Sequence, residues 1–421
     1  MGFTSLAYLM DLEWMQEAYR RTRKDAAVGV DGQTAADYER DLEANLHSLL
    51  ERAKAGTYKA PPVRRVYIPK PGSPPRTRPI GIPTLEDKVL QRAVTMLMEP
   101  IYEQDFYDSS YGFRPGRSAH QALQALWQQG MAHQGGYIVE VDIQHFFDTL
   151  DWTHLRTFLH QRIRDGVVLR LIGKWLQAGV LEEGQLHFPA TGSPQGGVIS
   201  PLLSNVYLHY VLDEWFEQQI QPRLKGTAYL IRYGDDFVLG FAQEEDARRV
   251  LAVLPKRFGK YGLTLHPDKT RLISFQRPPA GATGKSGGPG HPERSFDLLG
   301  FTHYWGRSRK GNWVIKRQTA ASRLSRALQR VSQWCRGNRH RPLQEQHHIL
   351  SQKLQGHYAY YGITGNGHAL AGFQHRVKEI WRTWLSRRHR GKPISWQRFQ
   401  RLLERYPLPP VRVVHSIYAQ T

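Results

Sequence analysis

Two adjacent carboxylates, Asp235 and Asp236, lie between two apolar half-strands in the stretch AYLIRYGDDFVLGFA, residues 228–242. Apolar and aromatic side chains alternate on both sides of a four-residue turn, and this period of two predicts a β-hairpin with the carboxylates at its tip. Asp142 ends a third apolar stretch, YIVEVD, which predicts a buried core strand. An unpaired carboxylate in such a position costs free energy unless a cation neutralises it.

These three carboxylates predict a metal site, provided that the strand ending at Asp142 pairs beside the hairpin. Such pairing would bring Asp142 to Asp235 and Asp236, and this cluster of oxygens suits a hard cation, of which Mg²⁺ is the expected one. Two Mg²⁺ ions about 3.5–4 Å apart stabilise both the attacking and the leaving oxygen of an in-line phosphoryl transfer. The repulsion at the turn would then serve to hold metal. A solvated acidic turn is the simpler alternative, because Asp is common in turns.

Two further stretches fit the same chemistry. Lys70 and Arg78 flank a loop rich in Pro and Gly, and their charges suit the triphosphate of a nucleotide. In TGSPQGGVISP, residues 191–201, the glycines permit close backbone approach and Gln195 offers a neutral hydrogen-bonding group. Lys70 is also compatible with an ordinary surface charge, and Gln195 with a turn residue.

Hydrophobic periodicity predicts the elements that carry these residues. The expected helices are residues 42–55, 85–99, 119–128, 155–163, 168–177, 202–217 and 247–258. The further expected strands are residues 63–68, 80–82, 263–265, 272–275 and 296–306. Residues 277–295 contain 4 Pro and 5 Gly, which predicts a flexible surface loop. Apolar stripes within residues 324–335, 350–361 and 370–384 predict a module of three packed helices.

Composition indicates a soluble, folded protein of a reducing compartment. The 421 residues are enough for two or three domains, and 40% apolar with 23% charged residues is typical of folded chains. No apolar run approaches the roughly 18 residues that a membrane span needs, and the N-terminus lacks the pattern of a secretory signal. The single cysteine, Cys335, excludes an internal disulfide and a Cys-based zinc site.

Positive charge is concentrated at one end of the chain. The net charge is +21, and residues 307–421 carry 23 Lys or Arg, 3 Glu and no Asp, so nearly all of it lies there. Such self-repulsion is costly, and a polyanionic partner is its natural explanation. Six tryptophans lie among the basic residues, which favours nucleic acid over a membrane surface. Arg323, Arg326 and Arg330 share one face of the first expected helix and are candidate RNA contacts, with a merely solubilising face as the alternative.

Taken together and in order, these motifs resemble the reverse transcriptase blocks of bacterial group II intron-encoded proteins. The motifs are RRVYIPKPGSPPRTRPIGIPT, SYGFRPGRSAHQAL, VDIQHFFDTLDW, GSPQGGVISPLLSNVYLH, RYGDDF, GLTLHPDKT and FDLLGF. GVDGQT, residues 29–34, resembles the N-terminal extension of the family, and LQGHYAYYGITGN resembles its maturase, or thumb, domain. The resemblance covers about residues 25–421. One departure is Gly234, where the family usually has Ala, and Gly is small enough to keep the turn.

The resemblance implies an α+β right-hand polymerase fold. Residues 1–60 would form the N-terminal extension, residues 61–305 the fingers and palm, and residues 306–421 a basic, all-helical thumb or maturase domain. Members of the family that cut target DNA carry a C-terminal endonuclease with paired Cys and His. We expect the short form without it, which relies on nicked or single-stranded targets.

Site roles also follow from the resemblance, residue by residue. Asp142 and Asp235 would be metal ligands with Asp236 beside them, and the carbonyl oxygen of Ile143 would be a further ligand. The nucleotide-binding positions would be Lys70 and Arg78 for the triphosphate, Gln195 for nucleotide positioning and Lys269 as the lysine of the late palm motif. Lys269 is a candidate proton donor to the leaving pyrophosphate.

The expected function is therefore RNA-directed DNA synthesis with two Mg²⁺ ions, from an RNA template, a DNA primer and dNTPs. The expected partners are a group II intron RNA, which the protein would help to splice, and a DNA target for retrohoming, with no membrane. The expected location is the bacterial cytoplasm, with nucleoid association during action on DNA.

Three alternatives remain open from the sequence. The tyrosine-glycine-aspartate-aspartate turn also resembles viral RNA-dependent RNA polymerases, but these place an Asp at the fifth residue after the first catalytic aspartate. Here that residue is Phe147, whose ring under the sugar would exclude a 2′-hydroxyl and so favour dNTPs, unless it is simply a core residue. The chain could also be a splicing maturase with little polymerase activity. A group II-derived enzyme recruited to host defence or to CRISPR spacer acquisition is the third possibility.

Overall fold

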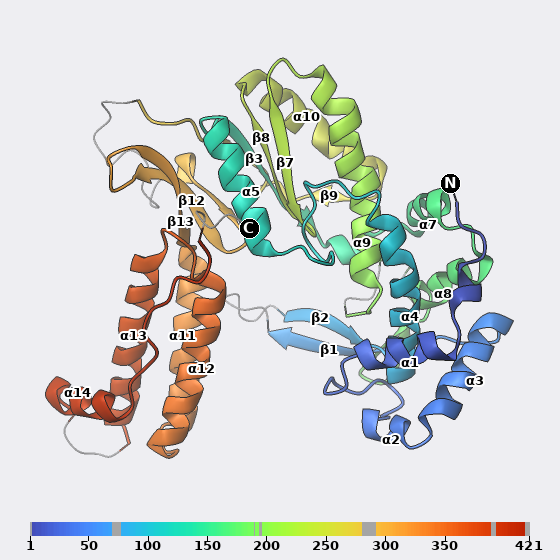
Figure 1. The fold of residues 1–421 in the computed structure, drawn as a ribbon, viewed down its shortest axis with the longest axis horizontal. Coiled ribbons are helices and arrows are strands. Elements are labelled where there is room, and N and C mark those ends of the chain that lie inside the picture. Colours follow the sequence, from blue (N-terminus) through green and yellow to red (C-terminus); the bar gives the residue numbers. More distant parts are fainter. Residues whose placement is uncertain are drawn as a thin grey trace. The chain divides into compact units, whose positions relative to one another are not determined.

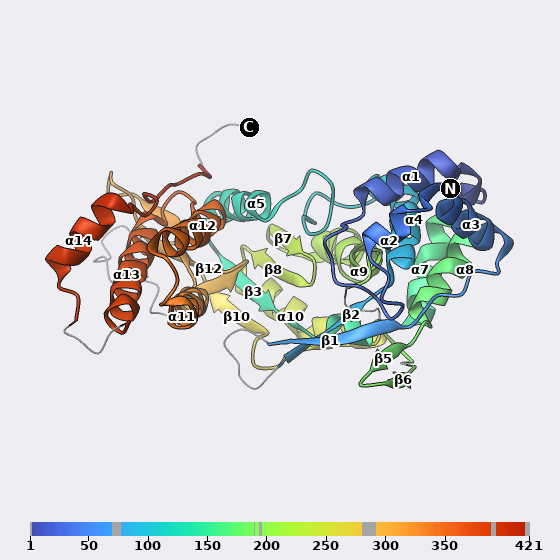
Figure 2. The same ribbon diagram turned by 90° about the horizontal axis from the view of Figure 1, so that it is seen from below.

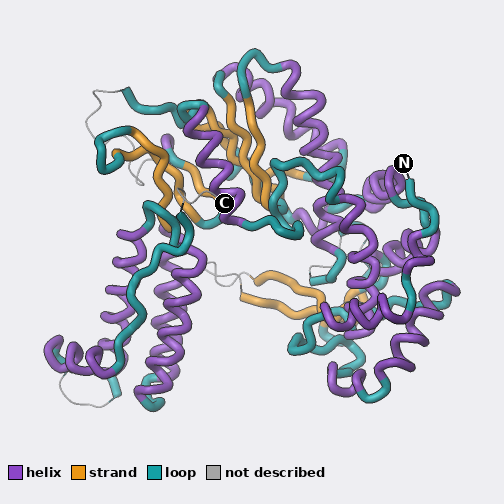
Figure 3. The backbone as a smooth tube through the Cα atoms, in the orientation of Figure 1, coloured by secondary structure: helices purple, strands orange, loops and turns teal. Residues whose placement is uncertain are grey.

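The computed structural model describes residues 2–69, 77–188, 190–192, 196–279, 292–388 and 393–416. The chain forms two compact units, one of Met1–Ala122 with Tyr137–Leu272 and one of 123–136 with 273–421. Each unit has its own hydrophobic core. Strands and helices alternate through the first unit, whereas most of the second unit is helical (Figure 3).

The central sheet of the first unit carries the expected hairpin. Its strands lie in the order β10-β3-β8-β7. Figure 1 shows β3, β8 and β7 together with helix α10, Glu244–Lys260, which packs against β3 and β8. The strands are β3 (Tyr137–Val141), β7 (Ala228–Tyr233), β8 (Asp236–Phe241) and β10 (Arg271–Ser274). Tyr233 pairs with Asp236, so residues 233–236 form the expected four-residue turn, with Gly234 and Asp235 as its two central residues. The core strands β7 and β8 are buried along most of their length on both faces. The alternation of their apolar residues therefore does not mark one solvent-exposed and one buried face.

Two smaller sheets complete the strands of this unit. One has the order β2-β1-β5-β6, in which the two expected strands, β1 (Val63–Pro69) and β2 (Thr77–Ile82), pair antiparallel. Its other strands are β5 (Val180–Glu182) and β6 (Gln185–His187). The third sheet pairs β4 (Ile143–Gln144) with β9 (Thr264–Leu265).

Helices of the first unit agree closely with the periodicity. Most residues of helix α4, Leu85–Tyr102, are buried, and Thr84 caps its N-terminus. Figure 2 shows α4 among the other helices of this unit. The other helices are α1 (Leu12–Arg21), α2 (Ala35–Glu39), α3 (Leu42–Ala55), α6 (Phe146–Thr149), α7 (Trp152–Arg162), α8 (Gly166–Leu176) and α9 (Ser200–Leu208). The helix expected over residues 202–217 is α9 followed by π-helical turns at His209–Asp213 and Phe216–Ile220.

The second unit begins with strands and ends with helices. Three strands form a sheet in the order β11-β12-β13, and four helices follow. They are β11 (Phe296–Leu298), β12 (Phe301–Arg307), β13 (Trp313–Thr319), α11 (Ala321–Asn338), α12 (Leu343–Tyr361), α13 (Gly367–Ser386) and α14 (Trp396–Arg405). The three predicted helices are confirmed, and α5 (Ala119–Ala132) contributes its residues from 123 onward.

One expectation for this unit is wrong, namely that the chain is all helical from residue 306. That boundary falls inside β12, and β13 continues as strand to Thr319. The physical reason is visible in β13, where buried and half-buried residues alternate strictly, as they must in a strand with one covered face. The division into an N-terminal extension, fingers with palm, and thumb stays a prediction. Among the described residues, no helix is long and apolar enough to cross a membrane.

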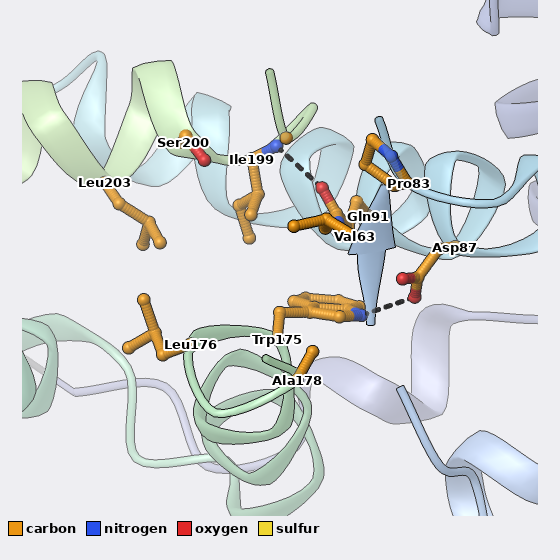
Figure 4. A pocket seen from close by; sticks show the side chains of 11 residues that line it. Val63, Pro83, Asp87, Gln91, Trp175, Leu176, Ala178, Ile199, Ser200 and Leu203 are labelled. Atoms are coloured by element: carbon orange, nitrogen blue, oxygen red, sulfur yellow. Dashed lines mark hydrogen bonds between the residues drawn. The ribbon is translucent and has the colours of Figure 1, made fainter. Parts of the chain in front are cut away.

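Helix α4 also carries a buried carboxyl group, Asp87, which is only 1% exposed. The indole Nε1 of Trp175 donates to its Oδ1 at 2.9 Å, and the hydroxyl of Tyr58 donates to the same oxygen. Figure 4 shows Trp175 and Asp87 meeting at the wall of a narrow cavity. Burial raises the pKa of Asp87 to about 7, against the two hydrogen bonds, which lower it.

We expect the protonation of Asp87 to contribute to the pH dependence of stability. The folded chain keeps the proton to about pH 7 and the unfolded chain loses it near pH 4, so the free energy of unfolding falls as pH rises through this range. Asp87→Asn has no proton to lose and keeps an oxygen for both donors. Its stability relative to wild type should therefore rise by about 3 kcal/mol from pH 5 to pH 8, at about 1.36 kcal/mol per pH unit.

Denaturant unfolding at the two pH values measures this difference. Asp41→Asn, at an exposed position, is the control and should run parallel to wild type. A difference between Asp87→Asn and wild type that does not change with pH would contradict a protonated Asp87.

Candidate active site

Strand pairing brings the predicted carboxylates to one edge of the central sheet. Val141 of β3 pairs with Phe237 of β8, so Asp142 and Asp236 are the next residues at the end of this pair. The pairing on which the metal-site prediction depended is therefore present. Asp235 occupies the turn between β7 and β8, next to them.

Electrostatics couples two of these carboxylates. Burial raises the pKa of Asp235, and the charge of Asp142 raises it further, while the guanidinium groups of Arg78 and Arg232 lower it. The two negative charges thus oppose each other, and two positive charges moderate the repulsion. Arg78, expected at the triphosphate, is an exposed residue of β2 whose charge reaches Asp235.

Lys269 neutralises the other carboxylate. Its Nζ donates to Oδ2 of Asp142 at 3.0 Å. The same chain segment is anchored to the strand end, because the backbone N–H of His266 donates to the carbonyl of Asp142 at 2.8 Å and Ile143 pairs with Leu265. Asp142 was expected to be buried, but its side chain is 35% exposed, since the strand ends there and β9 covers only the backbone.

A three-carboxylate cage is not formed among the described residues, in which no group of three Asp, Glu, His or Cys side chains is arranged to hold a metal ion. Three like charges repel one another, Asp142 is engaged by Lys269, and Asp236 is exposed at the start of β8. The convergence of all three side chains on a metal stays a prediction, as do the roles of the individual residues.

Two glycines between β6 and α9, Gly192 and Gly196, allow the close backbone approach that the sequence predicted. Gly192 has φ +93°, and a Cβ there would lie 2.9 Å from the carbonyl oxygen of Phe147. Gly196 has φ +117°, and its Cβ would lie 2.3 Å from the carbonyl oxygen of Gly81. Lys70 and Gln195 lie outside the described residues.

Gln91 of α4 holds the chain just after this glycine pair, and sequence reasoning missed it. Its Oε1 accepts from the backbone N–H groups of Val198 at 2.8 Å and of Ile199 at 3.3 Å. Figure 4 shows the Gln91 side chain reaching from α4 to Ile199. The available signal was a row of polar residues at four-residue spacing, Asp87, Gln91 and Thr95, in a helix whose other buried residues are apolar.

Phe147 lies in the short helix α6, five residues after Asp142. Its ring is half-buried and meets the edge of the Phe146 ring at a centroid distance of 5.4 Å. Its carbonyl is the one that Gly192 approaches. The backbone of α6 is therefore in contact with the loop of residues 190–192.

The three candidate RNA-binding arginines lie on α11 of the second unit. Arg323 and Arg330 are exposed, and Arg326 is half-buried between them. Partial burial lowers the pKa of Arg326, and the charges of Arg323 and Arg330 lower it further. These three residues thus concentrate positive charge on one helix face, as predicted.

Comparisons with known proteins agree with the geometry. The model of the reverse transcriptase (RNA-dependent DNA polymerase) family matches residues 68–303. Protein YkfC of Escherichia coli (strain K12) is 36% identical over 299 residues, which cover 62% of this chain and 76% of YkfC.

Two further relatives are named for introns. The group II intron-encoded protein LtrA of Lactococcus lactis subsp. cremoris is 40% identical over 209 residues, 49% of this chain and 34% of LtrA. The mitochondrial nuclear intron maturase 2 of Arabidopsis thaliana is 28% identical over 234 residues, 46% of this chain and 30% of the relative. The chain thus spans about a third of the length of each of these two proteins.

The family model covers more than half of the chain, and YkfC is matched over three quarters of its length. Six of the seven reverse transcriptase motifs lie within residues 68–303 and the first overlaps the start of this range, whereas GVDGQT and LQGHYAYYGITGN lie outside it. This chain therefore belongs to the reverse transcriptase family and is related to the group II intron-encoded reverse transcriptases and maturases.

Proposed function

We propose that this chain copies an RNA template into cDNA from a DNA primer and dNTPs by two-metal nucleotidyl transfer. In the same proposal it binds a group II intron RNA, assists its splicing and takes part in retrohoming to a DNA target. The observation that carries the proposal is the coupling of Asp142 and Asp235 at the end of the β3–β8 pair, inside the family-matched segment. The assignment of fingers and palm to the first unit, and of a thumb to α11–α13, belongs to this proposal.

The donor atoms at this sheet edge suit Mg²⁺. The carboxylates of Asp142 and Asp235 and the carbonyl of Ile143 are hard oxygen ligands. Burial and the neighbouring charge of Asp142 both raise the pKa of Asp235, so a bound divalent cation would relieve a repulsion that the fold retains. When bound, two Mg²⁺ ions would stabilise the attacking and leaving oxygens of the transfer. Asp236 would support them from the exposed start of β8.

The cationic side chains would bind the phosphates of the nucleotide. Lys269 holds Asp142 in an ion pair, and a nucleotide phosphate would compete for the same ammonium group. Lys269 is also the candidate proton donor to the leaving pyrophosphate. Arg78 and Lys70 would hold the triphosphate, and Gln195 would position the incoming nucleotide.

Basic residues of the second unit would supply RNA affinity. Positive charge is concentrated on α11 by Arg323, Arg326 and Arg330, which raises the free energy of the unbound protein. Release of counterions from the RNA phosphates on binding would offset this cost. The carboxylates belong to one compact unit and these arginines to the other. Catalysis and RNA binding should therefore be separable by mutation.

Asp142→Ala and Asp235→Ala should each abolish Mg²⁺-dependent primer extension, because each removes an oxygen ligand from the proposed metal site. The loss should exceed a thousandfold, or about 4 kcal/mol of barrier at about 1.36 kcal/mol per decade. The assay is cDNA synthesis on an RNA template. Asp268→Ala removes an exposed carboxylate beside Lys269 and should keep activity. Near-normal extension by either active-site variant would refute the assignment.

Phe147→Val should raise the incorporation of rNTPs relative to dNTPs, since a smaller side chain would leave room for a 2′-hydroxyl. Extension reactions with each nucleotide class measure the ratio. Phe146→Leu changes the neighbouring ring, which is buried, and serves as the packing control. If both variants keep the wild-type ratio with extension intact, Phe147 is only a packing residue.

Charge reversal of the arginine cluster, Arg323→Glu with Arg326→Glu and Arg330→Glu, should weaken intron-RNA binding and flatten its salt dependence. Each lost phosphate contact removes about one unit from the slope of log K against log salt. Binding titrations from low to moderate salt measure this slope. The control reverses three exposed arginines of the first unit, Arg156, Arg248 and Arg249, and so matches the change in net charge.

The aspartate variants complete this comparison. Asp235→Asn with Asp236→Asn should still bind the intron RNA and support its splicing at reduced Mg²⁺. An unchanged slope in the arginine variant, with binding lost in the aspartate variant, would overturn the proposed division of roles.

A further inference from the structure

We propose that a buried ion pair beneath the hairpin, Arg232 with Asp213, positions the turn that carries Asp235, together with Asn205. These three would be positioning residues, because the hydrogen bond from Arg232 to the turn is made to the backbone, at the carbonyl of Gly234. The inference rests on the proposed polymerase function, since it assigns these residues to that same site.

The ion pair is completely enclosed. Both side chains are 0% exposed, and the guanidinium group engages the carboxylate with two hydrogen bonds. Nε of Arg232 donates to Oδ1 of Asp213 at 2.8 Å, and Nη2 donates to Oδ2 at 2.5 Å. Such a forked arrangement fixes the plane of the guanidinium as well as its position.

The third nitrogen of this guanidinium points at the catalytic turn. Nη1 donates to the carbonyl of Gly234 at 3.1 Å and to Oδ1 of Asn205 at 3.0 Å. The carbonyl of Gly234 and the amide nitrogen of Asp235 belong to one planar peptide group. Fixing that carbonyl therefore fixes the direction in which the backbone enters Asp235.

A second segment is clamped against the same turn. Nδ2 of Asn205 donates to the carbonyl of Gly112 at 2.7 Å. The backbone of Arg232 accepts from the N–H of Tyr111 and donates to the carbonyl of Ser109, both at 2.8 Å. Gly112 approaches so closely that a Cβ would lie 2.2 Å from the backbone nitrogen of Gly234. The turn is thus held from the guanidinium side and from the segment of residues 109–112.

Stability alone does not account for this arrangement. Taking two charges out of water is expensive, and replacing a buried ion pair by apolar residues of similar size is often neutral or stabilising. An apolar pair could fill the space of Arg232 and Asp213, but it could not bind the carbonyl of Gly234. The hydrogen bond to the turn is therefore the contribution specific to this ion pair.

The test removes both charges together, in the full-length chain, with Arg232→Met and Asp213→Leu. A double replacement leaves no buried unpaired charge, which a single replacement would. The double variant should unfold near the wild-type temperature, yet kcat for primer extension should fall at least about a hundredfold, because small misplacements of reacting groups have costs of that size. KM for dNTP should change less than about threefold.

Hydrogen exchange gives a readout that does not depend on activity. Backbone amides of residues 233–237 should exchange faster in the double variant, while those of α4 should not change. Arg232→Lys is the second variant, since it keeps a charge for Asp213 but loses the fork that also reaches Gly234. It should lower kcat at least about tenfold with little change in unfolding temperature.

The matched control is the ion pair of Arg162 with Asp105, which lies in the same unit and is about 20% exposed. Arg162→Met with Asp105→Leu should keep kcat and exchange at the turn. Wild-type kcat in a folded double variant, or in Arg232→Lys if the double variant does not fold, would overturn the proposal, as would unchanged exchange at residues 233–237. Absence of extension by the wild-type protein would instead refute the proposed function, and the exchange measurement would still decide the positioning role.

Discussion

The pairing of β3 with β8, which brings Asp142 next to the turn that carries Asp235, is the interaction on which the geometry of the candidate site depends. Burial is the main cause of the raised pKa of Asp235, and the charge of Asp142 raises it further. The fold brings them together through the pairing of β3 with β8, and it moderates the repulsion with Lys269 at one carboxylate and Arg78 near the other. Like charges held together by the backbone are a general feature of sites that bind divalent cations.

The prediction of this site from sequence succeeded where the signal was local. Period-two alternation predicted the hairpin, and the strand before Asp142 was found in the same way. The four-residue turn at the tip of the hairpin is present, with Tyr233 paired to Asp236. A pattern of residue types could not show that Lys269 engages Asp142, and the convergence of all three carboxylates on a metal stays a prediction.

Residues that act at long range were not predictable from one sequence. Gln91 binds the backbone of residues 198 and 199, more than a hundred positions away, and Asn205 binds Gly112 at a similar separation. The signal that Arg232 did give was a charged residue in an apolar strand. Charge in such a position implies a buried partner, but nothing in the periodicity identified Asp213 as that partner. In the second unit, β13 was missed because its strand face carries Arg317, which interrupts the apolar alternation.

Gly234 shows how the turn and its support depend on each other. Its φ of +65° lies in the left-handed region that favours glycine, and a Cβ there would lie 2.9 Å from Cε2 of Phe113. The Phe113 ring is 50% exposed, so it could move, but Gly112 next to it is pressed against the nitrogen of Gly234 and could not. The family's usual Ala at this position would therefore require either a different φ or a displaced Phe113. Because the carbonyl of Gly234 is also the acceptor for Arg232, a change of φ at this residue would alter the same peptide plane that leads into Asp235. The backbone conformation of Gly234 and the hydrogen bond from the buried guanidinium of Arg232 thus act on the same peptide plane, which sets the orientation of Asp235.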